Sequence, residues 1–93
     1  MIVGVMQVEL MISDARTLKE KRRVVKSLKD RIGNEFNVSI AEVDALDRHR
    51  KAVLGICMVA NESDFVRQCF DKVLSCIRCC RGATLVDHQI DLI

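Results

Sequence analysis

The stretch GVMQVELMISDARTLKEKRRVVKSLKDRIG, residues 4–33, decides the fold because its apolar residues change period part-way along. Between Ile2 and Ile12 the apolar side chains alternate and many are branched, which is typical of a β-strand. After a polar turn the spacing becomes helical, and it predicts a buried stripe at Leu18, Val25, Leu28 and Ile32. Thr17 and Glu20 have the spacing of a capping box, and Gly33 with Asn34 favours termination. The stretch therefore predicts a strand followed by a helix.

Three further strands are predicted downstream. Residues 36–43 have apolar positions that slip between the two faces, which indicates a bulge or an edge strand. Residues 51–60 are apolar on both faces, as in a central strand, and residues 83–93 alternate again.

A second helix is predicted between the last two strands. Asn61 or Ser63 is its expected cap, and the helix is expected to run to about Arg81 and to end at Gly82. Its predicted core face consists of Val66, Cys69, Phe70, Val73, Cys76, Ile77 and Cys80.

The predicted order is β-α-β-β-α-β within a single domain over residues 1–93. With right-handed crossovers this order gives an α+β, ferredoxin-like βαββαβ fold. We expect an antiparallel sheet in the order 4-1-3-2 with both helices on one face.

The composition indicates the cellular compartment of the protein. No apolar run of about 18 residues is present, so no membrane association is expected. The N-terminal apolar run lacks a basic flank and a cleavage site, and it is interpreted as a strand rather than a signal peptide. The five cysteines are odd in number and mostly clustered, unlike a disulfide framework. These features predict a cytoplasmic protein.

The positive charge is concentrated in residues 16–33. This segment holds eight basic and two acidic residues, a net +6, whereas the whole chain has +2 and the remainder therefore −4. The predicted topology brings the start of the first helix, the hairpin near residue 48 and the end of the second helix to one end of the fold. The candidate nucleic-acid or anion-binding residues are Arg16, Lys19, Lys21, Arg22, Arg23, Lys26, Lys29, Arg48, Arg50, Lys51, Arg78 and Arg81.

Two interpretations of this charge remain open: an anionic partner, or a solvated helix surface. The chain has only three aromatic residues, none at the exposed sheet positions on which RNA-recognition sheets stack bases. Binding would therefore depend on phosphates, and structured RNA suits it better than a specific single strand. Lys21 falls on the apolar side of the helix, and we expect its stem to cross the core edge and its ammonium to reach solvent.

The sheet face without helices is expected to carry an apolar centre with a polar rim, as protein interfaces do. Its predicted centre consists of Val3, Val5, Val53, Cys57 and Val59. This pattern predicts a homodimer that pairs through the sheet.

No catalytic, metal-binding or cofactor-binding constellation is evident. Cys76 and Cys79 form a C-x-x-C near a helix C-terminus, where the dipole does not favour a thiolate, and further zinc ligands are lacking. His49 is expected to join the basic surface, and His88 to be a partly buried core residue. The loop before the first helix has Arg16 but none of the glycines of an acylphosphatase phosphate loop. We therefore predict neither an enzyme nor a metal or other cofactor.

The segments GVMQVELMISDARTLKEKRRVVKSLKDRI, FNVSIAEVDALD, LGICMVANE and DHQIDLI resemble the small bacterial YlxP-like family, whose function is unknown. The S/T-LKEKR helix start, here Thr17 to Arg22, carries the resemblance most specifically, and Glu42 and Asp44 correspond to the acidic pair before the hairpin. The resemblance implies a ferredoxin-like fold. The family's gene often lies among translation genes, which implies an association with RNA or the ribosome.

The sequence thus predicts a non-catalytic RNA-binding or ribosome-associated accessory factor. The alternative is a dimeric regulatory or scaffold protein that pairs through the open sheet face and binds a small anion at the start of the first helix.

Overall fold

The computed structural model describes all 93 residues, with the six elements in the expected order. The strands are β1 (Ile2–Met11), β2 (Ser39–Asp44), β3 (Lys51–Ala60) and β4 (Thr84–Leu92). The helices are α1 (Leu18–Glu35) and α2 (Ser63–Arg78). Neither helix combines the length and the apolar content needed to cross a bilayer.

The four strands form one antiparallel sheet in the order β2-β3-β1-β4, which confirms the predicted order. β1 is central, so that Val5 pairs with Cys57 of β3 on one side and with Asp91 of β4 on the other. The pairing of β2 with β3 shifts register between Glu42 and Asp44, which is the irregularity predicted for the second strand. A second shift interrupts the pairing of β1 with β4.

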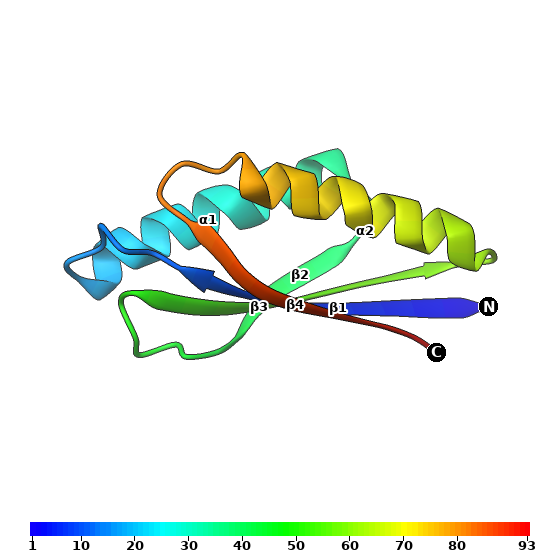
Figure 1. Cartoon of the computed structure of the whole chain (residues 1–93), viewed down its shortest axis with the longest axis horizontal. Helices are drawn as coiled ribbons and strands as arrows, with labels where there is room; N and C mark the ends of the chain where they lie inside the picture. Colours follow the sequence, from blue (N-terminus) through cyan, green and yellow to red (C-terminus); the bar gives the residue numbers. More distant parts are fainter.

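Both helices cover the same face of the sheet, as Figure 1 shows, and the other face has no helix. The strand residues that point to the helices form the core with the apolar stripes of α1 and α2. One close approach depends on glycine: a Cβ at Gly4 would lie 2.4 Å from Val66 Cγ1, so the absence of a side chain lets α2 pack against β1.

Several element boundaries differ from the predicted ones. α1 continues through Gly33 and ends at Glu35, because the solvent-exposed glycine tolerates helical backbone and Phe36 is the first residue to turn extended. β2 begins only at Ser39, since Phe36 packs against the core before strand pairing starts. α2 has Glu62 at its N-cap without a side-chain cap, and it ends at Arg78.

Candidate nucleic-acid interface

Three segments that are distant in sequence meet at one end of the molecule. The loop between β1 and α1 and the hairpin between β2 and β3 lie at the left of Figure 1, and the loop after α2 reaches toward them. Two hydrogen bonds join the first two segments: Arg50 Nε donates to the Ala15 carbonyl (3.4 Å), and the Ile12 N–H donates to the Arg50 carbonyl (2.8 Å). The predicted convergence of these segments is therefore present.

The third segment contacts α1. A Cβ built at Gly82 would lie 3.6 Å from Val24 Cγ2, so the loop after α2 rests beside the second turn of α1. Gly82 has φ +90, a backbone conformation that side chains disfavour, and this explains the glycine. We call the exposed cations of these three segments and of the adjoining ends of α1 and α2 the basic pole: Arg16, Lys19, Arg22, Arg23, Arg48, Arg50, Arg78 and Arg81.

The start of α1 has the predicted Thr17 cap, but Glu20 reaches back to the N–H of Arg16 instead of that of Thr17. Thr17 Oγ1 accepts a hydrogen bond from the Glu20 N–H (3.2 Å), and the Glu20 carboxylate accepts one from the Arg16 N–H. This capping box already places a carboxylate at the N-terminus of α1. An anion at the basic pole would therefore be bound by the arginine and lysine side chains and not by the free N–H groups of the helix terminus.

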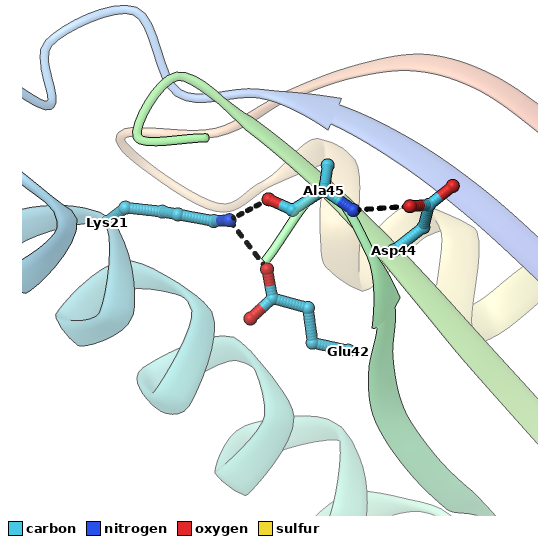
Figure 2. Close-up of polar contacts among 4 residues, drawn as sticks. All are labelled: Lys21, Glu42, Asp44 and Ala45. Atoms are coloured by element: carbon cyan, nitrogen blue, oxygen red, sulfur yellow. Dashed lines mark hydrogen bonds and ion pairs between the residues drawn. The ribbon is translucent and has the colours of Figure 1, made fainter. Parts of the chain in front are cut away.

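The prediction that the Lys21 ammonium reaches solvent is wrong. Lys21 is 0% exposed, and its Nζ lies 2.6 Å from Glu42 Oε2 and donates to the Ala45 carbonyl at 2.7 Å, as Figure 2 shows. The contact with Glu42 is an ion pair without hydrogen-bond direction, and no other donor reaches that oxygen. Lys21 is therefore already neutralised and is no longer a candidate for binding an external anion.

The acceptor Ala45 has an unusual backbone. Its φ is +57, in the left-handed region, and its N–H donates to Asp44 Oδ1 at 2.7 Å (Figure 2). The Lys21 ammonium and the Asp44 carboxylate thus hold the two sides of one strained residue at the start of the hairpin. Through this residue α1 fixes the hairpin that carries Arg48 and Arg50.

Sequence analysis did not find the partner of Lys21, although a signal was present. Glu42 is separated from Ile40 by one residue, so both point to the helix-covered face of an edge strand. A lysine on the apolar stripe of a helix and a glutamate on the inward side of a strand together predict a buried pair.

Other predicted cations lie outside the basic pole or are paired. Lys26 pairs with Asp30 at 2.7 Å, and the hydrogen bond that its ammonium donates to this carboxylate raises the pKa of Lys26. Lys29 is partly buried in a groove between α1 and β2, and Lys51 pairs with Glu9 at 3.3 Å on the open sheet face.

The open sheet face has the predicted apolar residues, with one exception. Val59 is 63% and Val5 37% exposed, Cys57 is exposed and Val3 is half-buried. Val53, however, is only 5% exposed, so it cannot contribute to an interface as predicted. It lies between the neighbouring strands β1 and β2, opposite Glu9 and Asp44, and their side chains leave it little surface.

The cysteines and histidines do not converge on a site. No group of three or more His, Cys, Asp or Glu side chains is arranged to hold a metal ion. Cys76 is buried, and burial raises the pKa of its thiol despite the opposing charge of Arg31. His49 is exposed in the hairpin. The prediction that His88 lies partly in the core is wrong, because β4 is an edge strand and this side chain is exposed.

Comparison with known proteins identifies the family of the chain. The model of the family described as "Protein of unknown function (DUF503)" matches residues 3–90. The chain belongs to this family. It is also 36% identical over 76 residues to the "Uncharacterized protein YlxP" of Bacillus subtilis (strain 168), covering 82% of this chain and 83% of that protein. The predicted family resemblance is confirmed.

Solved structures confirm the fold of this DUF503 member. The de novo designed protein LFR1 1, described as having a ferredoxin fold, matches with a TM-score of 0.63 at 16% identity, over 97% of this chain and 85% of the other. The designed protein Foldit4 matches with a TM-score of 0.57 at 11% identity, over 100% and 97% of the two chains. At such identities the likeness concerns the fold alone.

Proposed function

We propose that this DUF503 protein is a non-catalytic RNA-binding accessory factor of translation or ribosome assembly, and that it binds RNA phosphates through the basic pole. The observation that carries the proposal is the convergence of unpaired cations from three segments. None of the eight side chains of the basic pole forms a salt bridge, whereas Lys21, Lys26, Arg31 and Lys51 all do.

Uncompensated like charge destabilises a compact fold, so an anionic partner gives these residues a function. Arginines predominate in the basic pole, and their planar guanidinium groups suit phosphate oxygens. The fold also fixes the spacing of the cations, because Arg50 and Gly82 tie the loops to α1 and its preceding turn. Cations carried at fixed backbone positions suit an RNA whose own phosphates are fixed by base pairing.

The test is a salt series of binding to structured ribosomal RNA and to ribosomal subunits, from about 50 to 300 mM salt. We expect a steep fall in affinity with salt, because binding releases one counterion for roughly every phosphate contact. The double variant R22E/R23E should lose most of this binding and keep the native circular dichroism spectrum, since both side chains are exposed.

The double variant R67E/K72E is the matched control. It makes the same change in charge on exposed residues of α2, away from the basic pole. We expect R67E/K72E to bind nearly as the wild type does. Equal losses in the two double variants would show that net charge rather than the basic pole determines binding, and undiminished binding by R22E/R23E would refute the proposal.

The second candidate function is that of a homodimeric regulatory or scaffold protein. The exposed Val5, Cys57 and Val59 on the open sheet face favour it, because they are adjacent on β1 and β3. Sedimentation of the wild type and of V5D tests it. A dimer that dissociates in V5D is expected, and a monomeric wild type would exclude pairing through the sheet.

A further inference from the structure

A hollow of about 800 Å³ lies on the side of the sheet opposite the helices and shares Arg48 and Arg50 with the basic pole. Its walls are the hairpin from Asp47 to Lys51 and the end of β1 from Glu9 to Met11, with Val86 of β4 opposite the hairpin. Figure 1 shows the hairpin displaced from the sheet on the side away from α1 and α2. The volume is within the range of small-molecule sites, roughly 300–1,000 Å³.

The apolar part of this hollow results from the irregular pairing of β1 with β4. Glu9 pairs with Asp87 and Leu10 with Leu85, which leaves Val86 unpaired between them. Val86 is 54% exposed and Met11 46% exposed, and both line the hollow. A branched side chain and a polarisable thioether together offer a surface on which a planar ring can lie.

The polar part comes from the hairpin. Arg48 and His49 are exposed there, and neither side chain forms a hydrogen bond or an ion pair with another residue. Lys51 lines the same wall, but its ammonium already forms an ion pair with Glu9 at 3.3 Å. A ligand in this hollow thus meets an apolar surface on one side and free cationic or hydrogen-bonding groups on the other.

We propose that the hollow binds one nucleoside phosphate unit, with its base over Met11 and Val86 and its phosphate at Arg48 and His49. The proposal rests on the proposed RNA-binding function and adds a subsite to it. The unit has two possible sources, a free mononucleotide or an unpaired nucleotide of the RNA held by the basic pole. Base contact of this kind differs from stacking on sheet aromatics, which the chain lacks at these positions.

The hollow also favours particular bases. Asp47 lines it without a hydrogen-bond partner, and Glu9 has a second carboxylate oxygen beyond the one that faces Lys51. Both groups only accept hydrogen bonds, so they favour a base with an exocyclic amino group. Cytosine has this donor where uracil has an acceptor, so CMP should bind more tightly than UMP.

The experiment titrates the full chain with CMP, UMP, single-stranded pentacytidine and a blunt-ended RNA hairpin, and follows amide chemical shifts. We expect CMP and pentacytidine to shift the amides of residues 9–11, 47–51 and 86. V86D should weaken pentacytidine binding about tenfold, the scale of one apolar base contact, and should leave the blunt hairpin unaffected. Q89D is the control, because it places the same charge on an exposed residue of the same strand, β4, but outside the hollow.

The ligand series separates the sources and the failures. If CMP binds as tightly as pentacytidine, the natural ligand of the hollow is a free nucleotide. If pentacytidine binds much more tightly, the ligand is an unpaired nucleotide of an RNA chain. If the blunt hairpin binds through Arg22 and Arg23 while CMP and pentacytidine leave the hollow unshifted, the subsite is refuted and the proposed function stands. If no RNA binds, both are refuted. Equal affinity for UMP and CMP would overturn the role assigned to Asp47 and Glu9.

Discussion

Two ion pairs on α1 differ in surroundings but hardly in geometry. Lys21 lies 2.6 Å from Glu42, with the two side chains 0% and 11% exposed. Lys26 lies 2.7 Å from Asp30, with the two side chains 75% and 58% exposed. Both lysines belong to the same basic segment, and the distance between charges gives no indication of which pair matters.

Burial is what separates their effects. In the interior the charges have lost most of their hydration, so removing one member leaves the other without compensation. At the surface water and salt replace a lost partner. The buried pair also connects α1 to the hairpin, because Lys21 holds the carbonyl of Ala45. The buried Lys21 thus positions the exposed Arg48 and Arg50 of the hairpin.

The largest effect is expected from K21M, which keeps an unbranched side chain one atom shorter and removes the charge. Glu42 then lacks its only partner and Ala45 loses a hydrogen-bond donor. We expect the free energy of unfolding to fall by about 3 kcal/mol, the lower end for breaking a buried pair, because Glu42 keeps some contact with water. Urea denaturation followed by circular dichroism measures it.

R22M is the matched control, since it removes the adjacent exposed charge of the same helix. It should leave the unfolding midpoint unchanged while weakening RNA binding. The double variant K21M/E42L removes both buried charges and should regain much of the stability lost in K21M. If K21M unfolds at the same urea concentration as R22M, the buried pair does not have the stabilising role inferred here.

The comparison also shows where sequence analysis succeeds. The strand order and the convergence of three basic segments follow from hydrophobic period and handedness, which depend on many residues at once. The environment of Lys21 depends instead on one glutamate across a helix–strand contact and on one left-handed residue, Ala45. The exposure of His88 and the burial of Val53 likewise depend on which side chains lie beside each residue in the sheet. Such local contacts do not recur along the chain, so the hydrophobic pattern of the sequence does not predict them.

A smaller effect, of opposite sign, is expected from A45G. Glycine adopts the left-handed region without the steric cost that alanine has there, although it also loses more backbone entropy on folding. The carbonyl that accepts from Lys21 remains in place. We expect a gain of about 0.5 kcal/mol in the free energy of unfolding. A41G on the adjoining strand is the control and should destabilise, so a loss of stability in A45G as well would show that Ala45 is not strained.

The smallest effect is expected from K26M, which breaks the exposed pair. Its unfolding midpoint in urea should match that of the wild type, because both partners keep their hydration. The raised pKa of Lys26 fixes the sign of any residual contribution: it is fully present below the ordinary pKa of 10.5 and disappears as the pH rises through the folded-state value. Any difference between K26M and the wild type should therefore shrink in strong alkali and at high salt. A loss in K26M as large as that in K21M, unchanged by salt, would mean that burial does not distinguish the two pairs.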